Sequence, residues 1–161
     1  RDDVESRGLG DVYKRQTIAF IIVKITNLEL IRLNYGEEIV AEAERKVAEI
    51  LVENRKEGDI CGIFREGEFV LFADHTNFDL VRAYGNVRAY VKELNDKLKE
   101  CCLDDDRGYI KCAVGASVYP ETSDDYDELY EMAEKACEKA EHSEDARAVI
   151  YDKKEEEVSR S

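Results

Sequence analysis

The polar tetrapeptide Arg65-Glu66-Gly67-Glu68 lies between two apolar runs and holds the side chains best placed for chemistry in this sequence. The two runs, residues 59–64 and 69–72, are strand-like, so the tetrapeptide falls at the reversal of a β-hairpin. An acidic turn of this kind can hold a nucleotide together with its metal ion. The hairpin therefore predicts a nucleotide site.

The elements that must position this hairpin follow from the spacing of apolar residues. Residues 17–25 are rich in β-branched side chains and almost continuously apolar, which is typical of a central strand covered on both faces. Strands are expected over residues 17–25, 59–64, 69–72, 109–119 and 146–151, and helices over 27–34, 37–55, 78–98 and from a cap at Ser123 or Asp124 onward. The order βααββαβαβ predicts an α/β (α+β) sandwich with a central mixed five-stranded sheet flanked by helices.

Size and charge limit the possible partners. The 161 residues suit a single domain. Lys and Arg total 24 against 38 Asp and Glu, and the net charge of −14 argues against duplex nucleic acid or an anionic membrane as a partner. We expect a folded domain over residues 17–152, a charged tail over 153–161, and a non-domain segment over 1–16 that looks like a translated adapter.

The cysteines and acidic loops give no sign of a metal site. Five cysteines, an odd number with no C-x-x-C pair, predict neither a zinc site nor a disulfide framework and fit a reducing cytosol. Asp104-Asp105-Asp106 lacks the Gly and the distal Glu of a calcium loop. The longest apolar run, residues 18–23, is too short to span a membrane. We therefore expect a cytoplasmic protein without a bound metal.

Four segments occur in an order and at intervals that match a known family. They are residues 33–36 (Leu-Asn-Tyr-Gly), 64–69 (Phe-Arg-Glu-Gly-Glu-Phe), 114–120 (Val-Gly-Ala-Ser-Val-Tyr-Pro) and 126–133 (Tyr-Asp-Glu-Leu-Tyr-Glu-Met-Ala). From about residue 17 to 151 the sequence resembles the GGDEF family of diguanylate cyclases. The resemblance implies a nucleotidyl-cyclase-like GGDEF fold. It also implies the family's reaction, in which each subunit of a transient dimer holds one GTP and two magnesium ions, and two GTP molecules condense to cyclic di-GMP.

The side chains that the family uses to bind magnesium are replaced in this chain. The resemblance places Lys24 where the family has an Asp after the first strand, and Gly67 where it has the third residue of the signature. A lysine is no magnesium ligand at neutral pH, and a glycine offers no side-chain oxygen. Arg65 and Glu66 replace the two signature glycines. Glu68 keeps the signature but is expected to be vestigial, with no catalytic role.

Nucleotide-binding positions implied by the resemblance are also changed. A base-reading Asn of the family aligns with Arg32. A phosphate-gripping Lys and Arg near the end of the last long helix align with Glu141 and Asp145, and this charge reversal disfavours a phosphate. A slip of register would instead recruit Lys139 or Arg147.

The family's inhibitory product site is an R-x-x-D motif that ends five residues before the signature. Lys56 and Asp59 keep this spacing and form a weak remnant, because lysine lacks the flat guanidinium that stacks on guanine. The favoured interpretation needs no ligand. In it, Arg55 and Lys56 complement the dipole of a helix that Gly58 ends.

Three functions are compatible with these residues. The leading hypothesis is a degenerate GGDEF domain that makes no cyclic di-GMP, needs no cofactor and acts in cyclic di-GMP type signalling as a regulatory or protein-interaction module, with another protein domain or GGDEF-type partner. An alternative is an active cyclase in which Glu66 and Glu68 recruit magnesium for GTP. A further alternative is a nucleotide-binding sensor in which Lys24, Arg32 and Arg65 form an anion cluster.

Overall fold

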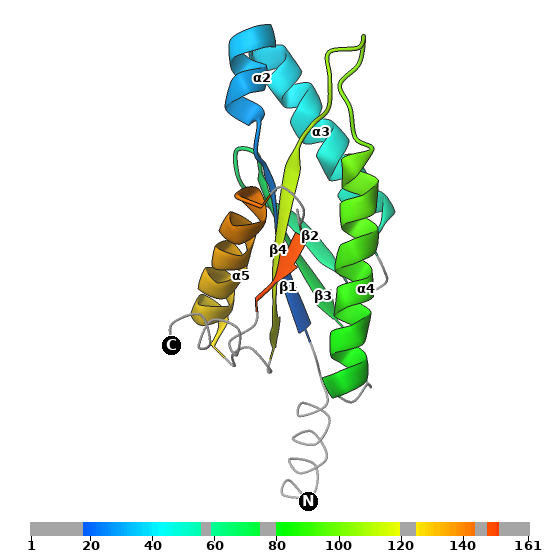
Figure 1. Cartoon of the computed structure of the whole chain (residues 1–161), viewed down its shortest axis with the longest axis vertical. Coiled ribbons are helices and arrows are strands. Elements are labelled where there is room, and N and C mark those ends of the chain that lie inside the picture. The colour runs from blue at the N-terminus through cyan, green and yellow to red at the C-terminus, as the bar shows by residue number, and fades with distance from the viewer. Residues whose placement is uncertain (1–17, 56–58, 75–79, 120–124, 144–147, 152–161) are drawn as a thin grey trace, which may run out of the picture.

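The computed structural model describes residues 18–55, 59–74, 80–119, 125–143 and 148–151, with side chains described outside residues 74–86. These residues form strands and helices in the predicted order (Figure 1). The elements are β1 (Ile18–Ile25), α2 (Leu28–Tyr35), α3 (Glu37–Glu53), β2 (Ile60–Arg65), β3 (Glu68–Asp74), α4 (Leu80–Lys99), β4 (Cys112–Tyr119), α5 (Tyr126–Glu141) and β5 (Ala148–Ile150).

The five strands form one mixed sheet with the order β2-β3-β1-β4-β5. β1 pairs antiparallel with β3 and β4, β2 pairs antiparallel with β3, and β4 pairs in parallel with β5. The predicted mixed five-stranded sheet is thus confirmed, with the apolar first strand at its centre. The sheet order brings the β2–β3 hairpin beside the end of β1.

Alternation along β1 assigns its side chains to two helical layers. Ile21 and Val23 are buried in a core that includes residues of α3 and α4, whereas Phe20 and Ile22 pack in a second core with residues of α5. In Figure 1 α5 covers one face of the sheet, and α3 and α4 lie on the other side. Because side chains alternate along a strand, Lys24 points to the same face as Ile22, toward α5.

A glycine sets the close approach of α5 to the sheet. A Cβ added to Gly115 of β4 would lie 2.2 Å from the backbone nitrogen of Cys137 and 2.3 Å from the carbonyl oxygen of Ala133. The hydroxyl of Ser117, on the same strand, donates to the carbonyl of Leu129 at 2.7 Å. The helix that carries four residues of the site described below is therefore fixed directly against β4.

Several predicted boundaries differ from the structure by a few residues, and two of these differences have a local cause. The strand expected from residue 109 begins at Cys112, because Tyr109 instead forms an isolated bridge with Cys102. α5 is capped by Asp125, whose side chain accepts from the backbone N–H of Asp127 at 2.9 Å, and not by a residue at 123 or 124. Among the described residues, no helix is both long and apolar enough to cross a membrane.

Candidate functional site

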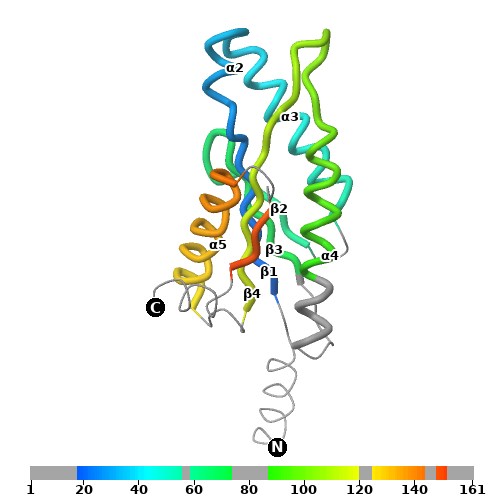
Figure 2. The backbone as a smooth tube through the Cα atoms, viewed as in Figure 1, coloured from blue at the N-terminus to red at the C-terminus, as the bar shows by residue number. Residues whose placement is uncertain are grey.

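A pocket of about 250 Å³ lies between the hairpin, the end of β1 and the C-terminal half of α5. The hairpin tip and the C-terminal end of α5 meet at the same end of the sheet (Figure 2). The described lining residues are Lys24, Ile25, Arg65, Glu66, Gly67 and Glu68 from β1 and the hairpin, and Glu134, Cys137, Glu138 and Glu141 from α5. Five carboxylates and two cations line the pocket, so its described wall is acidic.

One wall of this pocket is closed by an ion pair between β1 and α5. The Nζ of Lys24 donates to Oε2 of Glu141 at 3.1 Å, and both side chains are partly exposed. Burial by itself lowers the pKa of Lys24, but the hydrogen bond and the charge of Glu141 outweigh it, so the pKa is raised. Lys24 is therefore a stable ammonium whose charge is already matched by a carboxylate.

The guanidinium of Arg65 is held against the hairpin and α5. Its Nε lies 2.8 Å from Oε2 of Glu68, and its Nη2 donates to the hydroxyl of Tyr130 at 3.2 Å. The same group lies 4.7 Å from the ring centroid of Phe64, at cation–π distance. The signature residue Glu68, which is buried, thus neutralises the arginine that replaces a signature glycine.

Arg32 of α2 is surrounded by carboxylates. It pairs with Glu66 from the hairpin and with Glu29 on its own helix, and its Nε donates to Glu37 at 2.6 Å. The hydrogen bonds that Arg32 donates to Glu66, then to Glu29 and Glu37, raise its pKa. Each cation of the predicted anion cluster is therefore paired with acid in the described structure. Binding of an anion by Lys24, Arg32 and Arg65 stays a prediction.

Gly67 adopts a backbone conformation that favours glycine at the tip of the hairpin. Its φ is +72°, in the left-handed region, and a Cβ at this position would lie 2.7 Å from Cδ2 of Leu28. Its carbonyl accepts from the N–H of Ile25 at 2.8 Å, and its N–H donates to Oε2 of Glu44 on α3 at 2.9 Å. The turn is thus fixed from both sides by hydrogen bonds to its backbone.

Two further groups at the pocket carry protons that are hard to remove. Burial raises the pKa of the Cys137 thiol to about 12, and neighbouring glutamates add to this effect against the opposing charge of Lys24. Burial and a hydrogen bond that its hydroxyl donates to Glu134 raise the pKa of Tyr130 to about 12. At neutral pH Cys137 is therefore a neutral thiol and a poor nucleophile.

The remnant of the product site is only partly within the described residues. Asp59 is buried, and its charge, after burial itself, contributes to the raised pKa of Tyr90 on α4. Lys56 lies outside the described residues, as do Asp145 and Arg147 of the proposed phosphate clamp. Lys139 is exposed on α5 and does not line the pocket. A ligand for Lys56 and Asp59 stays a prediction.

Sequence reasoning found most of the lining residues but missed how they are connected. It treated Lys24 and Glu141 as separate changes, whereas the structure joins them in an ion pair. It did not find Glu44, which reaches the hairpin turn, or Glu134, which lines the pocket, because nothing local in the sequence marks either helix residue. Among the described residues, no group of three or more His, Cys, Asp or Glu side chains is arranged to hold a metal ion.

Comparison with known proteins agrees with this geometry. The family model "Diguanylate cyclase, GGDEF domain" matches residues 6–147. The chain therefore belongs to the GGDEF domain family, as its sequence motifs and its sheet order indicated. No curated protein sequence matches it. 

Solved structures share the fold at low sequence identity. The active GGEEF domain of a diguanylate cyclase from Vibrio cholerae is 18% identical, with 93% of this chain and 89% of that chain covered and a TM-score of 0.72. The GGDEF domain of DgcB from Caulobacter crescentus, in complex with c-di-GMP, is 15% identical. The match covers 93% of this chain and 87% of that chain, with a TM-score of 0.72. Diguanylate cyclase SiaD from Pseudomonas aeruginosa, in complex with its activator SiaC, is 14% identical. The match covers 91% of this chain and 54% of that chain, with a TM-score of 0.72.

Proposed function

We propose that this GGDEF domain makes no cyclic di-GMP and acts in cyclic di-GMP signalling as a regulatory or protein-interaction module. The observation that carries the proposal is the ion pair between Lys24 and Glu141 at 3.1 Å. By the family resemblance, these positions belong to a metal-binding acid and a phosphate-binding base. The pair exchanges the two charges, so the cation lies where a metal ion is needed and the carboxylate where a phosphate is needed.

The remaining donors do not fit two magnesium ions. Magnesium takes hard oxygen ligands in near-octahedral geometry, and Gly67 and Lys24 supply no such side-chain oxygen. Glu66 and Glu68, which the active-cyclase alternative requires, are engaged by Arg32 and Arg65. A metal ion would have to break both ion pairs before it gained these ligands.

The charge of the pocket also disfavours a triphosphate. Five carboxylates line the described wall, and its two cations are each paired with one of them. An anion that entered would meet uncompensated negative charge from Glu134 and Glu138 on α5. This repulsion supports loss of turnover more strongly than any single substitution does.

A role in protein contacts is supported by the outer strand of the sheet. Ile60 and Ile63 of β2 are 65% and 69% exposed, and residues 60–64 include no charged side chain. An exposed apolar edge strand is a common element of protein recognition. The SiaD structure, a cyclase with a protein activator, is consistent with protein partners for domains of this fold.

The test is a direct assay of the purified chain. It is incubated with GTP and magnesium beside a GGDEF domain that has an intact signature, and cyclic di-GMP is measured by chromatography. No product above background is expected, whereas product at the rate of the control domain would refute the proposal. Calorimetric titration with GTP and with cyclic di-GMP then tests the sensor alternative, for which saturable binding without turnover is the required result.

A further inference from the structure

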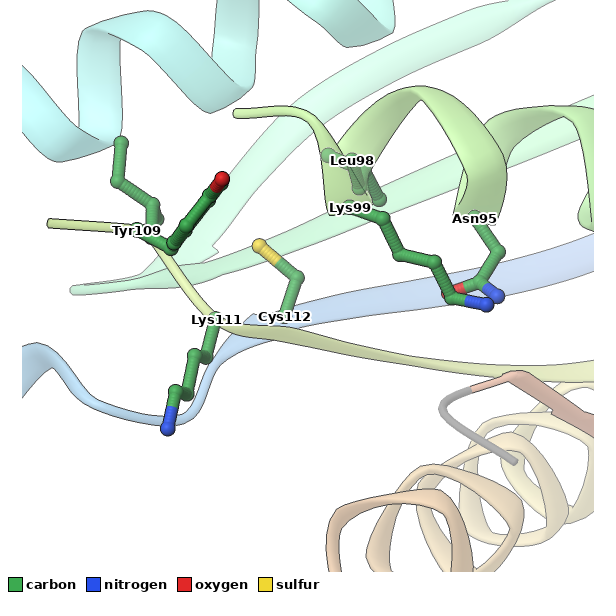
Figure 3. Close-up of a pocket in the computed structure, with 7 residues that line it drawn as sticks. Asn95, Leu98, Lys99, Tyr109, Lys111 and Cys112 are labelled. Atoms are coloured by element: carbon green, nitrogen blue, oxygen red, sulfur yellow. The ribbon is translucent and has the colours of Figure 1, made fainter. Parts of the chain in front are cut away.

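The outer edge of β2 is open to a further strand. β2 stands first in the sheet order β2-β3-β1-β4-β5, so among the described residues it pairs with β3 on one side and with no strand on the other. The cavity of about 330 Å³ beside the end of α4 is less defined, because Lys99 and Lys111 in its lining extend in different directions (Figure 3). An open strand edge presents backbone N–H and C=O groups that can pair.

Apolar side chains are exposed on both faces of this edge. Ile60 lies opposite Phe72, which packs against the core beneath α5. Ile63 lies opposite Phe69, which is buried in the core beneath α3 and α4. Since opposite residues share a face, the two isoleucines, 65% and 69% exposed, lie on different faces of the sheet. A helix docked on one face would cover only one of them, whereas a strand added at the edge adjoins both.

The backbone along this edge has room to pair. Within the part of the chain that the structure describes, residues 60–64 make no backbone hydrogen bond beyond their ladder with β3. A Cβ built at Gly62 meets nothing within 4 Å, so another backbone can approach closely. The ladder shifts register between Ile63 and Arg65, which limits further pairing to residues 60–64. The edge therefore accepts a short strand.

The sequence of β2 suits a second copy of itself. When a two-fold axis relates two antiparallel neighbouring strands, each face of the sheet continues across them, so opposite residues are an even number of positions apart. With the axis at Gly62, Ile60 lies opposite Phe64 of the second copy, and Cys61 lies opposite Ile63. This register matches each apolar side chain with another and brings the two glycines together at the centre.

Charge allows two copies to meet at this edge although each has a net charge of −14. Residues 60–64 carry no charge, and the same register brings Asp59 of one copy to the end of the paired segment where the other copy has Arg65. At an ionic strength of about 0.15 M the screening length is about 8 Å, so more distant charges contribute little repulsion. The paired segment thus places no like charges opposite each other.

We propose that β2 strands of two copies pair antiparallel about Gly62, so that two domains share one continuous sheet. This inference rests on the proposed function as a protein-interaction module and names a second copy of the chain as the partner. Because both copies use the same edge, the contact closes at a dimer. A short strand pair buries less than the roughly 1,000 Å² of a stable interface, so a dissociation constant on the order of 100 µM is expected.

Sedimentation velocity tests the dimer at about 0.15 M salt, with the chain varied from about 5 to about 500 µM. A monomer–dimer equilibrium is expected, and in ¹⁵N-labelled chain the amide shifts that change with concentration should lie in β2 and the adjoining β3. A monomer at every concentration, or growth beyond the dimer, would overturn the proposal. Either result leaves the proposed loss of turnover untouched, because the assay with GTP and magnesium tests that separately.

Charge variants make the test specific to the edge. Ile63→Lys places an ammonium group in the paired segment and should raise the dissociation constant roughly tenfold, and Ile60→Lys does the same from the other face. Both side chains are largely exposed in the single chain, so thermal unfolding should show that the variants fold. Leu33→Lys is the matched control, because it makes the same change at a residue of α2 that is 82% exposed. The proposal is also overturned if both β2 variants dimerise as tightly as the unchanged chain, or if Leu33→Lys weakens the dimer as much as they do.

Discussion

The ammonium of Lys24, near the end of the central strand, lies 3.1 Å from a carboxylate oxygen of Glu141, the last residue of α5. Each residue by itself departs from what the family resemblance implies at its position. Together they conserve the net charge of the site with the two signs exchanged. The structure thus presents the two departures as one coupled change.

The first prediction concerns this coupling. Lys24→Glu alone places a third carboxylate beside Glu68 and Glu141, and Glu141→Lys alone places two ammonium groups together, so each should destabilise the fold. The combined exchange should recover about 0.5–1 kcal/mol of the summed loss, a modest value because both side chains are partly exposed. Urea unfolding of the unchanged chain, the two single variants and the double variant measures the interaction free energy of the pair. The exposed Lys139→Glu serves as a control. Strictly additive losses would show that the two residues do not interact.

The second prediction concerns the turn of the hairpin. Gly67→Ala must place a Cβ at a φ of +72° and against the side chain of Leu28, and should lower the free energy of unfolding by about 1–2 kcal/mol. Gly62→Ala, in β2 of the same hairpin, meets nothing within 4 Å and has no positive φ. It should be close to neutral. Equal losses in the two variants, measured by denaturant unfolding, would contradict the assigned turn.

The third prediction concerns the close packing of α5 against β4 at Gly115. A methyl group at Gly115 would overlap the backbone of Ala133 and Cys137, and a helix backbone cannot turn aside as a side chain can. Gly115→Ala should therefore cost about 1–3 kcal/mol in unfolding free energy. Because α5 must move away from β4, the variant should also shift the NMR signals of Glu134 and Glu141. Unchanged signals at these residues would refute the close contact.

The fourth prediction concerns alkaline pH. A thiol whose pKa is raised in the folded state contributes stability that is fully present below its unfolded pKa, near 9, and that is lost as pH rises toward the folded value of about 12. Cys137→Ala should therefore reduce the fall in unfolding free energy from about pH 8 to about pH 11. The exposed Cys102→Ala is the matched control and should leave the slope unchanged. A slope that depends on neither cysteine would assign the fall to other groups.

Much of the fold could be predicted because it depends on local patterns. The continuous apolar run of β1 indicated a central strand, and the polar residues 65–68 indicated the reversal of the hairpin; both predictions are confirmed. The start of β4 could not be placed, because Tyr109 has the composition of a strand residue and is diverted by its bridge to Cys102. This bridge forms only if the chain after α4 places Cys102 beside Tyr109. The spacing of apolar residues in the sequence does not predict that position.

The site was predicted less completely for a similar reason. Residue types alone marked Lys24 and Gly67 as departures from the family, since that judgement needs only one position at a time. The contact from Glu44 to the N–H of Gly67 joins α3 to the hairpin across 23 positions of the chain, and the pair of Lys24 and Glu141 joins elements 117 positions apart. Contacts of this range are set by the packing of layers and leave no periodic signal in the sequence.

The three residues of β5 have an importance beyond their length. β5 pairs in parallel with residues 114–116 of β4, a strand that is buried almost throughout and carries no charged side chain. Without that cover, the backbone donors and acceptors of an apolar strand would be open to other copies of the chain. A chain that ends before Ala148 should therefore sediment as large assemblies in the ultracentrifuge while the full chain does not. The shortest strand of the sheet would then be what keeps the domain from aggregating.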